Sequence, residues 1–370
     1  MVRAVLREWL INPLSGWQVE PVYATATMPG YRYARQFARR LLDLPGSGTE
    51  DVVVEAWAGD VFFGLDFAPD TIVAQQENLR AWQNRGAKVS FMVYDLLPVL
   101  MPHVFPEGSG EGHEQWLTAI SQFDGLVCIS EAVAEEMKRW SESALKLDEL
   151  PRIEWIHLGA DIQHSAPTMG FPEGADRTLS AIRRRPTFLM VGTIEPRKGH
   201  LQAIAAFEQL WAKGVDVNLV IVGHEGWKML PDDLRRTIPR IVSTLRQHPE
   251  RCERLFWLEG VSDEYLEAIY EASSCLIAAS EGEGFGLPLI EAAQHGLPVL
   301  ARDIPVFREV AGEHAVYFSG LDAADLADAV QNWLEDVQRG CIPDPTLMTW
   351  HTWQDAARRI AQHLGVITEP

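Results

Sequence analysis

The segment SCLIAASEGEGFGLPLIEA, residues 274–292, decides the fold and locates its candidate site. A short apolar run ends in a glycine-rich loop, and a helix-forming stretch follows with Pro288 in its first turn. Gly282, Gly284 and Gly286 let the backbone come close to a ligand. A strand, a glycine loop and a helix in this order predict a βα unit whose helix amides can receive a phosphate.

On both sides of this segment, apolar runs of strand length alternate with amphipathic stretches, which predicts an α/β fold with parallel sheets. Helical spacing is found in TIVAQQENLRAWQNRG (71–86), EAVAEEMKRW (131–140), HLQAIAAFEQLWAKG (200–214) and LDAADLADAVQNWLEDV (321–337). The first half has predicted strands at DVVVEA (51–56), VFFGL (61–65), VSFMVYD (89–95), GLVCIS (125–130) and RIEWIHL (152–158). The second half has them at PTFLMVG (186–192), VNLVIVG (217–223), RLFWLEG (254–260), SCLIAAS (274–280), LPVLA (297–301) and HAVYF (314–318).

The stretch from about Gln163 to Arg185 is rich in Pro, Gly and polar residues, so we expect the boundary between two domains there. The predicted domains are residues 1–165 and 180–345. A helix at 350–365 is expected to pack back on the first of them. Two open α/β sheets place a ligand at the carboxyl ends of the strands, in a cleft between the domains.

Composition narrows the classes of function. The 370 residues are 47% hydrophobic and contain no apolar run of the roughly 20 residues that a membrane span needs. No secretory signal is recognisable, so we expect a cytoplasmic protein. A net charge of −20 argues against a nucleic-acid partner. The four cysteines are scattered, with no CxxC or Cys/His cluster, so no metal site is predicted.

A second loop, VGTIEPRKGH (191–200), also follows a predicted strand. Gly192 relaxes its turn, and Arg197 and Lys198 come just before a helix. Cations at a helix start oppose the helix dipole unless an anion lies there, and a guanidinium with an ammonium suits a diphosphate. A solvated Arg–Lys pair is the alternative.

The glycine loop carries two carboxylates, Glu283 before the predicted helix and Glu291 within it. A carboxylate accepts two hydroxyl hydrogen bonds, which suits the vicinal diols of ribose or a hexose. A glycine-rich turn with two solvated glutamates is the alternative that the residues alone leave open.

SEGEGFGLPLIEA resembles the Glu-x7-Glu motif of the retaining GT-B glycosyltransferases, particularly glycosyltransferase family 4. VGTIEPRKG resembles the phosphate loop of that family, and LEGVSDEYLEAIYEAS resembles its nucleoside-side loop and helix. In the first half, VYDLLPVLMP, GLVCISEAV and WIHLGAD resemble the acceptor domain, and TWHTWQDAARRI resembles the terminal helix that returns to it. The resemblance implies two Rossmann-like domains facing a cleft.

The resemblance also implies roles for individual residues. Arg197 and Lys198 would hold the donor diphosphate and stabilise the leaving group, and Glu283 would contact the donor sugar. Glu291 would bind the ribose hydroxyls. Because the two cations and the helix amides would supply the positive charge, no metal ion would be needed. Backbone contacts to the donor would come from Gly284, Phe285, Gly286 and Leu287, and contacts near the base from Val261 and Ser262.

Two departures from the family pattern bear on activity. Where many relatives have a histidine near the sugar, this chain has Tyr94-Asp95, so Asp95 is the candidate contact for the acceptor hydroxyl, with a loop-capping aspartate as the alternative. The opening MVRAVLREWL looks like the first helix of the family already under way. We therefore expect the first strand of the N-terminal domain to be missing from this sequence.

These observations predict a retaining glycosyltransferase that moves a hexose to a glycan or lipid-linked acceptor in polysaccharide assembly. The phosphate loop looks closest to those of bacterial mannosyltransferases, so GDP-mannose is the expected donor. A GT-B nucleotide-sugar epimerase and a non-catalytic sugar-nucleotide binding protein are the alternatives. Arg32, Arg35 and Arg39 form a stripe that would allow peripheral contact with the inner membrane face, or else a solvated helix face.

Overall fold

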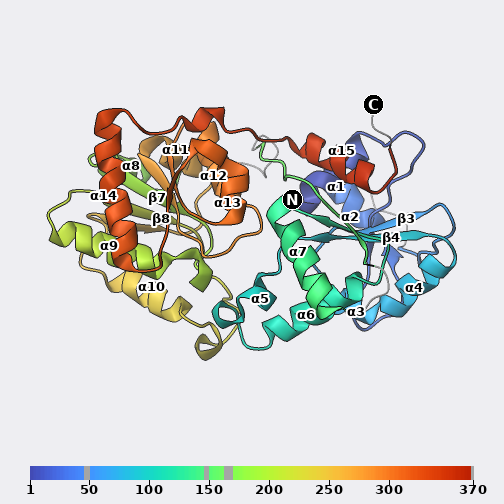
Figure 1. The fold of residues 1–370 in the computed structure, drawn as a ribbon. Coiled ribbons are helices and arrows are strands. Elements are labelled where there is room, and N and C mark those ends of the chain that lie inside the picture. The colour runs from blue at the N-terminus through green and yellow to red at the C-terminus, as the bar shows by residue number, and fades with distance from the viewer. Residues whose placement is uncertain (46–50, 146–149, 162–169, 368–370) are drawn as a thin grey trace. The chain divides into compact units, whose positions relative to one another are not determined.

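The computed structural model describes residues 1–45, 51–145, 150–161 and 170–367. The chain divides into two compact units (Figure 1). Unit 1 comprises residues 1–102, 108–161 and 350–370, and unit 2 comprises residues 103–107 and 162–349. None of the helices in the described ranges combines the length and the apolar character needed to span a bilayer.

Unit 1 is built on a parallel sheet with the strand order β3-β4-β5-β6, and helices cover the sheet. Its strands are β1 (Val22–Tyr23), β2 (Arg32–Tyr33), β3 (Val61–Gly64), β4 (Lys88–Val93), β5 (Gly125–Cys128) and β6 (Arg152–Trp155). Its helices are α1 (Val2–Ile11), α2 (Arg35–Leu41), α3 (Pro69–Ala74), α4 (Gln76–Asn84), α5 (Leu97–Leu100), α6 (Ser109–Ile120), α7 (Glu131–Ala144) and α15 (Trp353–His363).

Unit 2 is built on a second parallel sheet, with the strand order β12-β11-β10-β7-β8-β9. Its strands are β7 (Thr187–Val191), β8 (Asn218–Val222), β9 (Leu255–Leu258), β10 (Cys275–Ala278), β11 (Val299–Arg302) and β12 (Val316–Phe318). Its helices are α8 (Ala175–Ile182), α9 (His200–Ala212), α10 (Ile238–Gln247), α11 (Asp263–Ala272), α12 (Leu287–Gln294), α13 (Pro305–Ala311) and α14 (Ala323–Arg339).

The strand order of unit 2 fixes where a ligand would bind. From β7 the chain builds outward through β8 and β9, and it then returns to the other side of β7 for β10, β11 and β12. This is the doubly wound order, and its switch point lies between β7 and β10. The loops that follow these two strands are VGTIEPRKGH and SEGEGFGLPLIEA, so the topology brings both predicted motifs to the switch point.

The predicted strand DVVVEA is wrong. Val53 forms only an isolated antiparallel bridge to Arg32, and Val52 and Val53 are about half exposed. The backbone of Tyr33 donates to Val52 O, and Val54 N donates to Tyr31 O. The segment therefore extends the small β1–β2 ribbon rather than the parallel sheet, because no layer of helices covers its valines.

The helical stretch 71–86 is confirmed as helical, but it is divided between α3 and α4 at Gln75. The Gln75 side chain is buried and bonds to the backbone of the loop before β2. Its Oε1 accepts from Gly30 N at 2.8 Å, and its Nε2 donates to Thr25 O at 2.8 Å and to Met28 O at 2.7 Å. These bonds hold the glutamine at the break between the two helices.

Three further observations concern the ends of the predicted domains. The opening segment is confirmed as a helix, α1. In the predicted boundary region, residues 162–169 lie outside the described residues, and Ala175–Ile182 form α8 of unit 2. At the other end, α15 packs on α1 of unit 1, where Trp9 Nε1 donates to Ala357 O at 3.0 Å.

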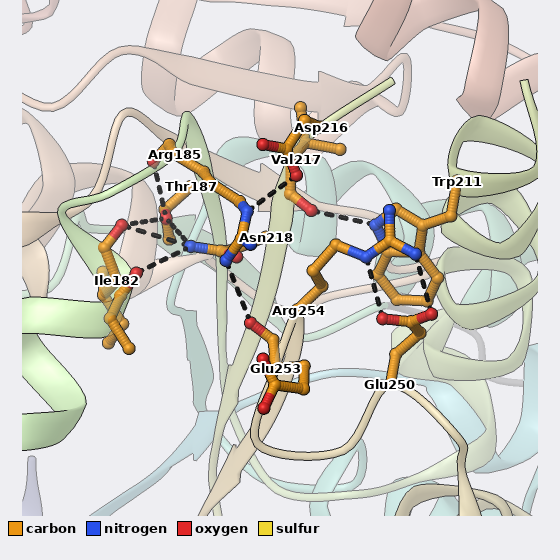
Figure 2. Close-up of polar contacts among 11 residues, drawn as sticks. Ile182, Arg185, Thr187, Trp211, Asp216, Val217, Asn218, Glu250, Glu253 and Arg254 are labelled. Carbon is orange, nitrogen blue, oxygen red and sulfur yellow. Dashed lines mark hydrogen bonds and ion pairs between the residues drawn. The ribbon is translucent and has the colours of Figure 1, made fainter. Parts of the chain in front are cut away.

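A polar network connects the amino ends of β7, β8 and β9 (Figure 2). The two motif loops follow the carboxyl ends of their strands, so the network lies at the opposite ends of the strands. Asn218 is fully buried, and its Nδ2 donates to Thr187 Oγ1 at 2.9 Å and to Ile182 O at 3.2 Å. Arg185 pairs with Asp216 at 2.7 Å and donates to the backbone oxygen of Glu253. This network belongs to the stability of unit 2, because it lies at the far ends of the strands from the motifs.

Candidate functional site

Arg197 and Lys198 lie in a short 3-10 turn, Pro196–Lys198, between β7 and α9. Gly199 follows with φ 74°, and a Cβ there would come within 2.5 Å of Ala279 O. Only glycine fits this position, because the turn packs directly on the end of β10. Glycine at this point therefore sets the two cations against the loop that carries Glu283.

Glu283 receives both cations. Arg197 Nη1 lies 2.9 Å from Glu283 Oε2, and Lys198 Nζ pairs with Oε1 of the same carboxylate. Ser280 Oγ also donates to Oε1, at 2.7 Å, and a second carboxylate, that of Glu195, lies 3.2 Å from Arg197 Nη2. The loop is fixed further because Arg197 Nη1 donates to Gly282 O at 2.9 Å.

The electrostatics of this cluster follow from its burial and its charges. The side chains of Glu283, Arg197 and Lys198 are only 12%, 15% and 16% exposed. Burial alone would raise the pKa of Glu283, but Lys198 and Arg197 outweigh it and lower the pKa to about 2. Glu283 is therefore ionised at neutral and mildly acidic pH.

A small cavity of about 20 Å³ lies against this cluster. Lys198, Glu283, Gly192 and Gly286 line it, together with residues of α12 and α13. His200, the first residue of α9, also lines it and was not predicted from the sequence. Its position directly after the motif RKG was the one signal that could have found it.

Glu291 lies on α12 and does not line this cavity. Tyr270 Oη donates to Glu291 Oε2 at 2.8 Å, and the ring of His295 stacks on Tyr270 with centroids 5.1 Å apart. Burial raises the pKa of Glu291, and the hydrogen bond from Tyr270 opposes this rise. The bond from Tyr270 therefore fixes one oxygen of the Glu291 carboxylate.

Ser262 has a structural use for its hydroxyl. Its Oγ caps α11 by accepting from Tyr265 N at 3.2 Å and donates to Gly170 O at 2.7 Å. Val261 precedes it in the loop after β9. In the glycine loop, Phe285 is buried, and Gly286, with φ 101°, is the N-cap of α12, followed by Leu287.

Asp95 belongs to unit 1, at the carboxyl end of β4. Its Oδ1 accepts from Leu97 N at 3.0 Å, which is the arrangement of a loop-capping aspartate. His113 Nε2 lies 3.0 Å from Asp95 O, and burial lowers the pKa of this histidine. Glu136 adds a carboxyl whose pKa is raised to about 7 by burial. The sequence did not single out His113 or Glu136.

A larger cavity, of about 910 Å³, lies in unit 1 and contains none of the predicted catalytic or donor-binding residues. It runs along β3, the edge strand of its sheet, and its wall includes Trp17, Tyr31 and Phe62. We assign no ligand to it, because the chemistry expected from the motifs lies in unit 2.

The fold and the site define a class: two Rossmann-like α/β units of the GT-B type. Residues 176–340, which lie in unit 2, match the family described as glycosyl transferases group 1. Among solved structures, the chain is similar to sucrose-phosphate synthase from Thermosynechococcus elongatus, with TM-score 0.56 and 21% identity over 82% of this chain and 69% of that one. It is also similar to Anabaena HepE in complex with UDP and glucose, with TM-score 0.60 and 16% identity over 83% of this chain and 78% of that one.

Three relatives in sequence are mannosyltransferases by name. The chain is 41% identical over 374 residues to the serotype-specific mannosyltransferase WbdA of Escherichia coli, covering 99% of this chain and 44% of the relative. It is 30% identical to O-antigen chain mannosyltransferase B of Escherichia coli over 40% of this chain and 36% of the relative. It is 31% identical to the phosphatidyl-myo-inositol mannosyltransferase of Mycobacterium tuberculosis over 55% of this chain and 50% of the relative. The chain thus spans less than half the length of the WbdA relative.

Proposed function

We propose that this chain is a retaining hexosyltransferase that transfers mannose from GDP-mannose to a glycan or lipid-linked acceptor in polysaccharide assembly. The observation that carries the proposal is the Arg197–Lys198–Glu283 cluster at the switch point of unit 2. The mannosyltransferase names of the relatives support the choice of sugar. Those relatives are transferases, so neither the epimerase nor the non-catalytic binder is carried further.

In the proposed reaction, the bond between the sugar C1 and the diphosphate oxygen breaks, a bond from C1 to the acceptor oxygen forms, and the acceptor hydroxyl gives its proton to the departing diphosphate. Lys198 and Arg197 stabilise the negative charge that develops on the departing diphosphate, which is the main catalytic effect we assign. Glu283 and the backbone of Gly284–Leu287 hold the sugar, Glu291 holds the ribose, and Val261 and Ser262 lie beside the base. Asp95 contacts the acceptor hydroxyl.

A panel of nucleotide sugars in a thermal-shift assay tests the donor. A ligand at about 100 times its dissociation constant adds roughly 2.7 kcal/mol of stability, and we expect GDP-mannose to give the largest shift. A larger shift with a UDP-sugar or an ADP-sugar would contradict the choice of donor. Nuclear magnetic resonance of the anomeric proton of the product then tests retention.

Variants of the cluster test the site. We expect Lys198→Ala to lower kcat by roughly 100- to 1,000-fold, the range found when one donor to a developing anion is removed. Asp95→Asn tests the acceptor contact and should raise the KM for acceptor while the affinity for GDP is kept. Wild-type turnover in Lys198→Ala would remove the cation cluster from the mechanism.

We also propose a peripheral membrane contact through Arg32, Arg35 and Arg39. Each of these side chains already has a local partner, since Arg35 lies over the ring of Tyr33, Arg32 reaches Asp51 O and Arg39 reaches Pro45 O. Charge reversal at the three arginines should weaken sedimentation with anionic phospholipid vesicles. Unchanged sedimentation would remove this contact from the proposal.

A further inference from the structure

The two cations assigned to the donor diphosphate already hold an anion that belongs to their own chain. Arg197 Nη1 lies 2.9 Å from Glu283 Oε2, and Lys198 Nζ pairs with the other oxygen of the same carboxylate. Ser280 Oγ adds a hydrogen bond of 2.7 Å to Oε1. With three donors on two oxygens, the Glu283 carboxylate occupies the place where a phosphate oxygen would otherwise lie.

The space beside the cations does not admit a diphosphate in addition to Glu283. The cavity there measures about 20 Å³, which is room for roughly one water molecule. Ligand sites of nucleotide size have volumes of roughly 300 Å³ or more. Within this cavity, a diphosphate can therefore take the position next to Lys198 only if Glu283 leaves it.

The charges make such an exchange feasible. Arg197 keeps Glu195 when Glu283 leaves, but the loss of one carboxylate from two buried cations would still be costly, and a diphosphate supplies the negative charge that Glu283 withdraws. The released carboxylate is then free to accept hydrogen bonds from hydroxyl groups. The cations are paired before and after the exchange, and only the identity of the anion changes.

We propose that Glu283 is a resident counter-ion that the donor diphosphate displaces from Lys198 and Arg197, and that the displaced carboxylate then binds the donor sugar. The second half of this proposal rests on the proposed function. The first half concerns an anion alone and can be tested without any sugar.

The test is the dissociation constant of inorganic pyrophosphate, measured by isothermal titration calorimetry at fixed ionic strength. If Glu283 competes for the cations, Glu283→Gln removes the competitor, and we expect pyrophosphate to bind roughly tenfold more tightly than to the wild type. The same variant should lose turnover of the nucleotide sugar. An unchanged or weaker affinity for pyrophosphate would overturn the exchange.

A matched control separates competition from a general charge effect. Glu281 lies two residues away in the same loop, and its backbone amide bonds to Arg197 O. Its carboxylate is in none of the ion pairs with Arg197 or Lys198 described above. Glu281→Gln removes the same single charge, so we expect it to leave the affinity for pyrophosphate near the wild-type value. A rise equal to that of Glu283→Gln would mean long-range repulsion and would overturn the exchange.

A second variant covers the case in which Glu283→Gln does not fold. Ser280→Ala removes one hydrogen bond from Glu283 and leaves both cations paired, so pyrophosphate should bind roughly threefold more tightly. An unchanged constant in Ser280→Ala would then count against the exchange.

The inference and the proposed function fail in different ways. If the wild type turns over a nucleotide sugar but the variants bind pyrophosphate no more tightly, only the exchange fails. If the wild type binds neither pyrophosphate nor any of GDP, UDP and ADP, the proposed function fails, and the exchange fails with it.

Discussion

His200 is the histidine of the candidate site whose protonation is most affected by the fold. It is buried at the start of α9 and lines the small cavity beside Lys198 and Glu283. Its Nδ1 has no hydrogen-bond partner among the described residues. Burial, with the two nearby cations, lowers its pKa to about 4. His200 is therefore neutral in the folded protein above that pH, and its ring can offer an uncharged contact to a ligand.

This neutral histidine predicts a pH dependence of stability. The unfolded chain takes up a proton at His200 below about pH 6.5, whereas the folded chain does so only below about pH 4. The stability is therefore fully present above about pH 6.5 and falls by about 3 kcal/mol as the pH drops to about 4. His200→Gln should flatten the plot of unfolding free energy against pH in this window. The exposed His103 provides the control, and a His103→Gln slope different from the wild type would contradict the assignment.

Tyr270 predicts a selective loss of affinity for the ribose. Its hydroxyl holds one oxygen of Glu291, so Tyr270→Phe should reduce the preference for GDP over 2′,3′-dideoxy-GDP by roughly tenfold. Tyr317→Phe is the matched control, because Tyr317 Oη donates to the backbone oxygens of Phe307 and Gly312, at 3.2 Å and 2.8 Å. Equal weakening of both nucleotides by Tyr270→Phe, measured by calorimetry, would mean a general structural effect instead.

At the residue scale, the sequence predicted which side chains gather but not what they bond to. Arg197, Lys198 and Glu283 follow neighbouring strands of a parallel sheet, and such strands end at one edge, so their meeting was predictable. Their direct pairing was not, because it depends on side-chain positions that the order of the strands does not determine. Tyr270 escaped prediction because a single tyrosine in a helix has no distinguishing pattern, and His200 escaped it because its position after RKG was its only signal.

At the element scale, β7, β8 and β10 of unit 2 were predictable because they are buried on both faces and read as continuous apolar runs. DVVVEA also contains a run of apolar residues, but Val52 and Val53 are exposed to solvent. The amino-acid composition of a short segment does not show whether other elements pack on it. The break at Gln75 was hidden for another reason. It is held by hydrogen bonds to residues about 45 to 50 positions earlier in the chain, which no local pattern encodes.

The polar network at the amino ends of the strands of unit 2 predicts a variant that affects stability without affecting binding. Asn218→Ala removes the hydrogen bonds from Nδ2 to Thr187 Oγ1 and Ile182 O, while Thr187 Oγ1 still donates to Ile182 O, so we expect a cost of about 1 to 3 kcal/mol of unfolding free energy. The strand places this residue roughly 15 Å from the motif loops, so the affinity for GDP should be unchanged. Urea unfolding measures the loss of stability, and calorimetry measures the affinity for GDP. Loss of GDP affinity in the folded variant would contradict the prediction that the network affects stability alone.

At the scale of the whole molecule, the chain returns to its first unit at its end. Residues 350–370 belong to unit 1, and the backbone of Trp353 donates to Asp161 Oδ1 at 2.6 Å. His363 Nε2 lies 3.2 Å from Trp155 O. Unit 1 is therefore completed only after unit 2 has been made.

This closure predicts that the last helix stabilises the first unit. Ile360 is fully buried on α15, so Ile360→Ala should lower the unfolding free energy of unit 1 by about 2 to 4 kcal/mol. Unit 2 should keep its affinity for GDP. The exposed Arg358 on the same helix gives the control, since Arg358→Ala should change little. Calorimetric scans with and without GDP measure both effects. If GDP no longer stabilised the Ile360→Ala variant, the expectation that unit 2 keeps its affinity for GDP would be contradicted.

The close contacts of the glycines in the motif loops limit how this protein can be diversified. A Cβ at Gly199 would meet Ala279 O at 2.5 Å, and one at Gly286 would meet the ring of Phe307 at 2.9 Å. A library aimed at new donor specificity should therefore keep both glycines, and also Ser262, whose hydroxyl caps α11, and randomise Val261 beside it. In natural or laboratory evolution of this chain, we expect the glycines beside the proposed phosphate site to stay constant while residues near the proposed base site change.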